Sequence, residues 1–403
     1  MSARALPSAA EVVVVGGGLE GCAAAWQLTT RGVTDVLVLE RSTVGSGMTG
    51  KSSGIVRCHY GVPTLAAMAV YGTEVFEHAS DLFSDGLDIG FRSCGYVVGV
   101  GPENVEALHA NLAAQRAAGV QTETIDHATV AELWPTARLD DFAAFAHEPR
   151  GGYGDAYLTA QAFAAAARRG GARVAQGAGV AAIETDAEGV CGVRLGDGSR
   201  VASRQVVLAA GPWSVALAAP LGVDLPIRVH REEIILLKPG VPTEGLPVFS
   251  DLVSLQYVRP DVGGEILFGN SDLATLKPAD PDHYLDRADD AFVDMAAAKI
   301  GHRFPGLDDA VLASSYAGCY DVTPDYNPVI STVPAMPGLV VAAGFSGHGF
   351  KISPAVGRLV ADLVVDGTSS DPRVPEHDLR LARFAEGDLL RSPHPYVGAG
   401  EMR

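Results

Sequence analysis

The sequence is poor in cysteine and in basic residues. Its five cysteines are odd in number, widely separated and never spaced as CxxC, so they encode neither a disulfide framework nor a thiolate zinc site. Lys and Arg total 30 against 48 Asp and Glu, a balance that opposes the attraction to phosphate on which nucleic-acid binding depends. We therefore expect no metal, no nucleic acid and no anionic membrane as a partner, and a reducing cytoplasm as the compartment.

Uninterrupted apolar runs and targeting signals are also missing. The first residues lead into a strand without a basic region or a cleavage site, so no signal peptide is predicted. Residues 326–350 contain no charged side chain, but Pro328, Pro334 and Pro337 interrupt them. They predict a series of loop, strand and turn instead of a membrane helix.

What the sequence does contain is length, glycine and a βαβ unit. Its 403 residues include 47 glycines, and at ~150 residues per domain they predict two or three domains. Val12–Val15 is typical of a strand buried on both faces, Leu19–Thr30 predicts a helix, and Val36–Leu39 predicts a second buried strand. Val206–Leu208 and Leu339–Val341 also end at glycines, where ligands of open α/β sheets bind.

The turn after the first strand reads GGGLEG and satisfies the dinucleotide fingerprint GxGxxG. Gly16 permits the tight turn, Gly18 lets the backbone approach a pyrophosphate, and Gly21 lets helix and strand pack closely. Glu40, which ends the second strand, is expected to accept hydrogen bonds from an adenosine ribose and to disfavour NADP. The fingerprint leaves FAD and NAD open, and the glycine and hydroxyl stretch at residues 45–54 adds donors for a phosphate or a flavin edge.

The sequence between the strands at 206–208 and 339–341 has a different pattern. Residues 227–268 contain short apolar runs suited to antiparallel strands, Ile234–Leu237 and Glu265–Phe268. An antiparallel sheet is therefore expected to interleave with the nucleotide domain. Residues 378–403 predict only a helix and a loose tail.

Five motifs together resemble the FAD-dependent amine and amino-acid oxidoreductases of the D-amino-acid oxidase superfamily. They are the fingerprint with Glu40, SGIVRCHYG at 53–61, GGYGDA at 151–156, AAGPW at 209–213 and GFSGHGFK at 344–351. The last is the most specific, and it is most similar to the branch of sarcosine oxidase and dimethylglycine dehydrogenase. The resemblance covers nearly the whole chain.

The resemblance implies an α/β fold (α+β overall) of two interleaved domains. A Rossmann-type FAD-binding domain would comprise residues 1–85, 148–222 and 316–385. A substrate-binding domain built on a large, mostly antiparallel sheet would comprise residues 86–147 and 223–315. Residues 386–403 would form a C-terminal tail.

The resemblance also implies a reaction. FAD would oxidise the C–N bond of an amino acid or N-alkylamino acid by hydride transfer to flavin N5, giving an imine that hydrolyses, and oxygen or another acceptor would take the electrons. Two alternatives stay open, an FAD-dependent 2-hydroxy-acid dehydrogenase and a flavin-carrying subunit of a larger electron-transfer complex. A homo-oligomer is compatible with the sequence.

Substrate-site residues follow from the same resemblance. Arg57 and Lys351 match the positions that hold the substrate carboxylate in sarcosine oxidase, as a guanidinium fork and an ammonium can. A cation is disfavoured in the first turn of a helix, which indicates that Lys351 is there for a ligand. The other candidates are histidines and tyrosines: His59, His348, Tyr60, Tyr257 and Tyr320.

The predicted FAD contacts combine the fingerprint with the resemblance. They are Gly16, Gly18, Leu19, Gly21, Glu40, Arg41, Gly47, Thr49, Ser52, Ser53, Gly54, Val180, Ala210, Gly211, Trp213, Gly318, Gly347, His348, Gly349, Phe350 and Lys351. The glycine turn before Lys351 would aim helix N–H groups at the negative charge that a reduced flavin gains at N1 and the C2 oxygen.

Several positions depart from the sarcosine oxidase branch. A lysine that promotes reaction with oxygen reads Leu267, a histidine near the substrate reads Ser271, and an arginine reads Gly54. These departures argue against fast use of oxygen and against sarcosine as the substrate, with Lys51 as a candidate for the missing charge.

The sequence also bears on how FAD is attached. The monomeric enzymes of this branch attach FAD to a cysteine at the position of Gly318, whereas Cys319 lies one residue further. Because a one-residue slip turns a strand side chain to the opposite face, we predict noncovalent FAD and a buried Cys319.

Overall fold

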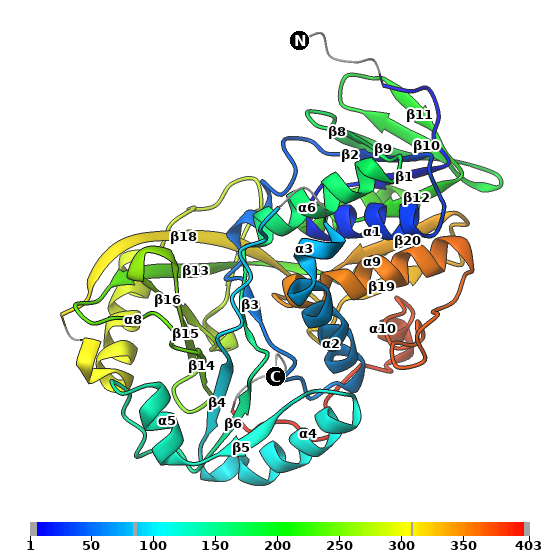
Figure 1. The fold of residues 1–403 in the computed structure, drawn as a ribbon. Helices are drawn as coiled ribbons and strands as arrows, with labels where there is room; N and C mark the ends of the chain where they lie inside the picture. The colour runs from blue at the N-terminus through cyan, green and yellow to red at the C-terminus, as the bar shows by residue number, and fades with distance from the viewer. Residues whose placement is uncertain (1–5, 84–86, 308, 399–403) are drawn as a thin grey trace.

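The computed structural model describes residues 6–83, 87–307 and 309–398 (Figure 1). Within them, a six-stranded sheet is ordered β19-β20-β12-β1-β2-β8. Its strands are β1 (Val12–Val15), β2 (Val36–Leu39), β8 (Arg173–Ala175), β12 (Gln205–Leu208), β19 (Val329–Thr332) and β20 (Leu339–Ala343). Neighbouring strands pair in parallel, except that β19 runs antiparallel to β20.

Both faces of this sheet are covered, which explains the continuous valine run of β1. Val12 and Val14 pack toward the helices, whereas Val13 and Val15 pack toward a small antiparallel sheet. The covering helices are α1 (Leu19–Thr30), α2 (Pro63–Glu77), α6 (Ala156–Arg169) and α9 (Gly349–Val365). The small sheet consists of β9 (Val180–Asp186), β10 (Gly189–Leu195) and β11 (Arg200–Ala202).

A second, mostly antiparallel sheet fills the lower left of Figure 1 and contains nine strands among the described residues. Its strands are β4 (Tyr96–Val100), β5 (Glu123–Ile125), β6 (Ala144–Glu148), β13 (Arg228–Lys238), β14 (Val248–Asp251), β15 (Gln256–Pro260), β16 (Ile266–Asn270), β17 (Lys277–Pro278) and β18 (Val311–Val322). Helices α4 (Val105–Ala117), α5 (His127–Leu133) and α8 (Asp290–Arg303) pack against it. The long pair β13 and β18 extends from this sheet to the six-stranded one (Figure 1).

The remaining elements are short. They are β3 (Ile55–Val56), which pairs with β7 (Gly152–Tyr153), and the helices α3 (Ala79–Leu82), α7 (Ser214–Ala218) and α10 (Arg383–Glu386). The predicted fold class and the predicted βαβ elements are confirmed. The domain boundaries stay a prediction.

The prediction of a loose tail is wrong for the residues before 399. The Asn104 side chain donates to the carbonyl of Val397 and accepts its N–H, at 3.0 and 2.7 Å. Tyr396 is buried, and its hydroxyl lies 2.9 Å from Nε2 of His59. Side chains distant in sequence hold this segment in place, and no periodic pattern within the segment could have predicted that order. Residues 399–403 lie outside the described part.

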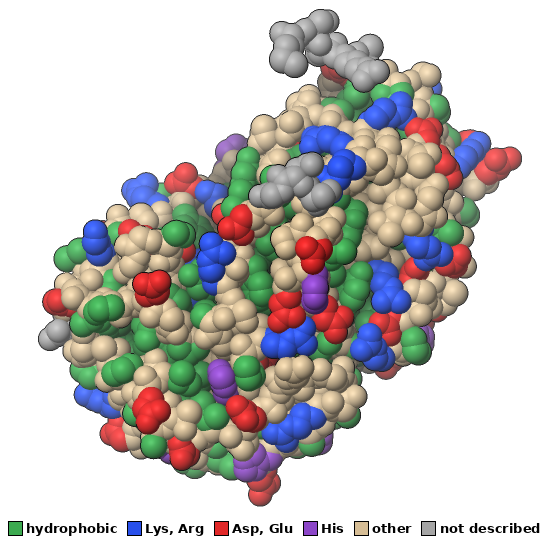
Figure 2. All heavy atoms as spheres, in the orientation of Figure 1, with side chains coloured by type: hydrophobic (Ala, Val, Ile, Leu, Met, Phe, Trp, Pro, Cys, Tyr) green, Lys and Arg blue, Asp and Glu red, His purple; other side chains and the backbone are tan. Residues whose placement is uncertain are grey.

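No helix among the described residues is long and apolar enough to span a membrane. Residues 326–350 form β19, β20 and the first two residues of α9, in line with the predicted loop, strand and turn. On the face shown in Figure 2, acidic and basic side chains are interspersed. The five cysteines are all free thiols.

Candidate active site

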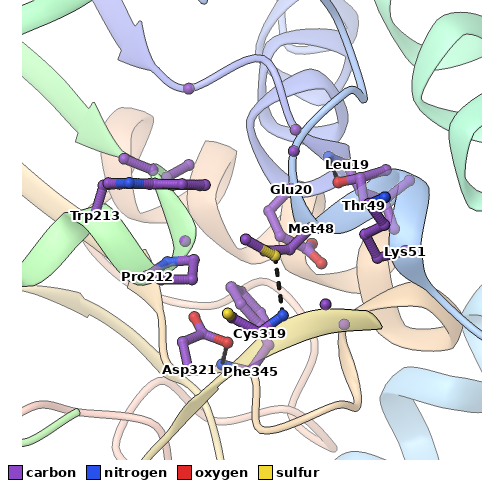
Figure 3. A pocket seen from close by; sticks show the side chains of 18 of the residues that line it. Leu19, Glu20, Met48, Thr49, Lys51, Pro212, Trp213, Cys319, Asp321 and Phe345 are labelled. Carbon is purple, nitrogen blue, oxygen red and sulfur yellow. Dashed lines mark hydrogen bonds between the residues drawn. The ribbon is translucent and has the colours of Figure 1, made fainter. Parts of the chain in front are cut away.

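A cavity of about 610 Å³ runs from the carboxyl ends of β1, β2 and β12 to the face of β13 and β18 (Figure 3). Most predicted FAD contacts line it: Gly16, Gly18, Leu19, Glu40, Arg41, Gly47, Thr49, Ser52, Ser53, Val180, Ala210, Gly211, Trp213, Gly318, Gly347, Gly349 and Phe350. Four others, Gly21, Gly54, His348 and Lys351, do not line it. Tyr320 lines the cavity, whereas the other predicted substrate residues lie outside its wall.

The fingerprint turn forms one end of the cavity. Gly16 has a φ of +108°, and a Cβ there would lie 2.3 Å from the carbonyl oxygen of Ala209. A Cβ at Gly21 would lie 2.0 Å from the carbonyl oxygen of Gly16. Only glycine fits either position, so α1 begins close to the end of β1, with Thr49 accepting the N–H of Leu19 at 3.0 Å.

Glu40 and the aromatic ring of Trp213 lie near the end of β2. Each Glu40 carboxylate oxygen accepts a backbone N–H, from Gly17 at 2.8 Å and from Ser42 at 2.7 Å. A carboxylate oxygen has two lone pairs, so both can still accept from ribose hydroxyls. The Arg41 guanidinium lies 3.9 Å from the ring centre of Trp213.

Asp282 contacts both of these side chains. It was not predicted from the sequence. One of its oxygens accepts from both Arg41 and Trp213, each at 2.9 Å. It comes from the loop after β17, over two hundred residues beyond Arg41, so no local motif marks it.

The far end of the cavity is built on β13 and β18. Glu232 lies opposite Gly318 in the strand register, so both project to the same face. A Cβ at Gly318 would lie 2.7 Å from Cβ of Lys51, which also lines the cavity. Burial raises the pKa of Glu232 to about 8, with Glu233 adding to the rise. The sequence reasoning missed Glu232 because only the pairing of β13 with β18 directs it inward.

Cys319 lines the cavity beside Gly318, which it follows by one residue in the strand. It is buried and lies opposite Arg231 in the register, on the other face of β18 from Gly318. Its backbone N–H donates to Sδ of Met48 at 3.1 Å (Figure 3), and burial raises the pKa of its thiol to about 11. The predicted burial is confirmed, and noncovalent FAD stays a prediction.

Asp321 holds the turn between β20 and α9. Its carboxylate accepts the N–H groups of Gly344 at 2.7 Å and Phe345 at 3.1 Å, and its carbonyl accepts that of Ser346. Burial nevertheless raises the pKa of Asp321 to about 6. The glycines of this turn were predicted from the sequence, whereas the carboxylate that fixes it was not.

A buried basic cluster lies behind the turn and consists of Arg57, His59, Tyr60, His348 and Lys351. The Arg57 guanidinium lies 4.4 Å from the ring centre of Tyr60 and donates to the carbonyl of His59. The Tyr60 hydroxyl lies 3.1 Å from Nδ1 of His348, and the Lys351 ammonium donates to the carbonyl of Gly347 at 3.5 Å. Because Gly347, Gly349 and Phe350 line the cavity, the cluster adjoins it.

Two positions that depart from the sarcosine oxidase branch, Gly54 and Leu267, are enclosed by their neighbours. Gly54 has a φ of +69°, and a Cβ there would lie 2.1 Å from the carbonyl oxygen of Gly154, so no arginine fits. Leu267 is buried in the core of the large sheet. The predicted substrate residue Tyr257 is paired with Gly269 of β16, where a Cβ would lie 2.0 Å from its Cζ, and it does not line the cavity.

The profile of the FAD dependent oxidoreductase family matches residues 11–363. The chain belongs to this family. Its cofactor is FAD, and the predicted resemblance is confirmed. The site fits that cofactor, because the cavity offers a glycine turn at a helix start, a carboxylate beside it and polar groups along its length.

Relatives and solved structures agree on the family. The chain is 29% identical to 4-methylaminobutanoate oxidase (formaldehyde-forming) of Paenarthrobacter nicotinovorans over 90% of its own length, but it spans only 44% of that protein. It is 29% identical to sarcosine oxidase subunit beta of Rhizobium meliloti, over 94% of the chain and 89% of the relative. The structure of L-proline dehydrogenase from P. horikoshii matches with a TM-score of 0.87 and 26% identity, covering 95% of the chain and 100% of that protein.

Proposed function

We propose that this oxidoreductase acts on the C–N bond of an amino acid or N-alkylamino acid. The observation that carries the proposal is the position of Arg57 and Lys351, which are only 4% and 6% exposed and belong to the basic cluster beside the FAD cavity. A buried cation needs a nearby negative charge, which Glu148 provides in part for Arg57 and which a substrate carboxylate would add. The names of the relatives, which include a glycine oxidase and a sarcosine oxidase subunit, support the same substrate class.

The residues of the cluster have complementary tasks in this proposal. Arg57, whose guanidinium lies 4.4 Å from the ring centre of Tyr60, would present a planar fork to the substrate carboxylate. Lys351 adds a second positive charge from the first turn of α9. Phe345 and Phe350 exclude water from the adjoining cavity wall. When bound, FAD supplies the hydride acceptor, and the protein orients the carbon beside the amine nitrogen toward it.

Anaerobic mixing tests the reaction class. The purified yellow protein is mixed with a panel of amino, N-methylamino and 2-hydroxy acids, and the flavin absorption band is followed. We expect bleaching by one or more amino or N-methylamino acids. Bleaching by hydroxy acids alone would overturn the proposal and favour the 2-hydroxy-acid dehydrogenase, with His348 as the candidate base.

A flavin-carrying subunit is the second candidate, because the chain resembles sarcosine oxidase subunit beta over 89% of that protein. Such a subunit would pass electrons to a partner protein instead of oxygen. Measuring the mass of the protein purified from its source separates the two, since only a complex contains other chains. The five free thiols support a reducing, cytoplasmic compartment in either case.

A further inference from the structure

Glu20 brings a carboxyl group into the FAD cavity from the first turn of α1. It occupies a variable position of the GxGxxG fingerprint, lines the cavity, and extends into it (Figure 3). Its side chain reaches toward the start of α9, since a Cβ at Gly349 would lie 2.6 Å from its Oε1. The carboxyl group therefore lies between the two helix starts that border the cofactor site.

The Glu20 carboxyl is not satisfied by the protein. Its Oε2 is buried and has no hydrogen-bond partner among the residues that the structure describes. A carboxylate left without donors in a buried place is costly. The opposite case is visible in the same cavity, where each oxygen of Glu40 accepts a backbone N–H.

Burial and the nearby carboxylate of Asp321 disfavour the Glu20 anion, against the positive ends of α1 and α9, which favour it. Burial raises the pKa of Glu20 well above its ordinary value, and the carboxylate of Asp321 on β18 adds to the rise. Cys22, on the same helix, has a pKa raised to about 12, so its thiol is neutral. The residue of α9 that lies beside Glu20 is Gly349, which has no side chain to donate a hydrogen bond. A bound pyrophosphate would add further negative charge to this cavity. A neutral carboxylic acid, by contrast, carries an O–H donor.

We propose that Glu20 binds FAD as a neutral acid and donates its proton in a hydrogen bond to an acceptor atom of the cofactor. The proposal adds a side-chain donor to a site otherwise lined by backbone groups at the fingerprint. It depends on FAD as the cofactor but not on the substrate class, so it stands or falls separately from the proposed reaction.

Release of FAD from the holoenzyme tests this inference. Free FAD fluoresces, so its dissociation constant can be followed by diluting the yellow protein at pH values from 6 to 10. We expect FAD binding to weaken more with rising pH in the wild type than in Glu20→Gln, because ionisation of Glu20 removes its donor. Glu20→Gln keeps an N–H donor without the titration, so only the pH dependence due to Asp321 and Glu232, which also line the cavity, should remain.

Glu20→Leu completes the design, because it removes the donor and keeps the volume. We expect about tenfold weaker FAD binding than in Glu20→Gln at every pH, the typical effect of one hydrogen bond. Glu123→Gln, at an exposed carboxylate, is the matched control and should follow the wild type. Circular dichroism confirms that each variant is folded.

Two results would overturn the proposal. One is a Glu20→Gln variant that loses FAD with the same pH dependence as the wild type. The other is a Glu20→Leu variant that holds FAD as tightly as Glu20→Gln at pH 6. Neither result would touch the proposed amine chemistry, which the substrate panel tests.

Discussion

The buried carboxylate of Glu148 accepts the backbone N–H of Cys58 at 2.7 Å. This hydrogen bond joins β6 of the large sheet to the segment that carries Arg57. Burial raises the pKa of Glu148 to about 7, although the nearby Arg57 guanidinium and the hydrogen bond from Cys58 both lower it. The anchor of the proposed carboxylate site therefore titrates near neutral pH.

This titration predicts a pH-dependent stability. A carboxyl group whose pKa is raised by folding stabilises the folded state fully below its unfolded pKa, and that contribution is lost as the pH rises through about 7. A rise from 4.5 to about 7 corresponds to roughly 3 kcal/mol. Glu148→Gln keeps an acceptor for Cys58. Its melting temperature should fall less than that of the wild type when the pH is raised from 5 to 8. Parallel melting curves for the two proteins would refute this prediction.

Replacing Gly54 by alanine should lower the free energy of unfolding through a steric clash, and Gly177 provides a matched control. Gly54 and Gly177 both have a φ of +69°, but a Cβ at Gly177 meets no atom within 4 Å. Gly177→Ala should therefore lose about 1–2 kcal/mol of unfolding free energy from the left-handed backbone alone. Gly54→Ala should lose clearly more, because its Cβ collides with the carbonyl of Gly154. Equal losses in urea unfolding would show that the backbone relaxes around the collision.

Trp213 and Asp282 predict unequal effects on FAD affinity. Trp213 lines the cavity, so Trp213→Ala should raise the dissociation constant of FAD about tenfold through lost apolar contact. The ion pair of Arg41 with Asp282 is about half exposed, and such pairs contribute little. Asp282→Asn should therefore change the constant less than threefold in a fluorescence titration. A larger effect of Asp282→Asn than of Trp213→Ala would contradict this ranking of the two side chains.

Glu232 predicts a pH dependence of anion binding. Its carboxyl group lines the far end of the cavity and becomes negative as the pH rises through about 8. The affinity for (methylthio)acetate, an unreactive carboxylate shaped like an N-methylamino acid, should therefore fall through that range. In Glu232→Gln the fall near pH 8 should be absent, as read from perturbation of the flavin spectrum. Identical pH profiles would remove Glu232 from the substrate end of the site.

The sequence predicted the parts of the site whose signal is local. The βαβ unit, the GxGxxG turn and Glu40 follow from a strand, a helix and glycines that adjoin in sequence, and the structure has them at the expected residues. Asp282, Asp321 and Glu232 were not found, because each reaches the cavity through pairing or loop contacts with distant segments.

The C-terminal segment shows the same limit from the other side. Its sequence has no strand or helix periodicity, yet the hydrogen bond of Tyr396 to His59 and the two bonds between Asn104 and Val397 fix it. Such order depends on a surface made by the rest of the chain, and no pattern within the segment encodes it.

Discrimination between a substrate and its decarboxylated amine tests the central claim most directly. The ratio of their anaerobic flavin-reduction rates is measured in the wild type, in Arg57→Ala, in Lys351→Ala and in the control Arg200→Ala, whose side chain is exposed and paired with Glu184. We predict that the wild type and the control prefer the carboxylate-bearing amine by at least tenfold and that the first two variants lose most of this preference. An unchanged ratio in Arg57→Ala and Lys351→Ala would contradict the account.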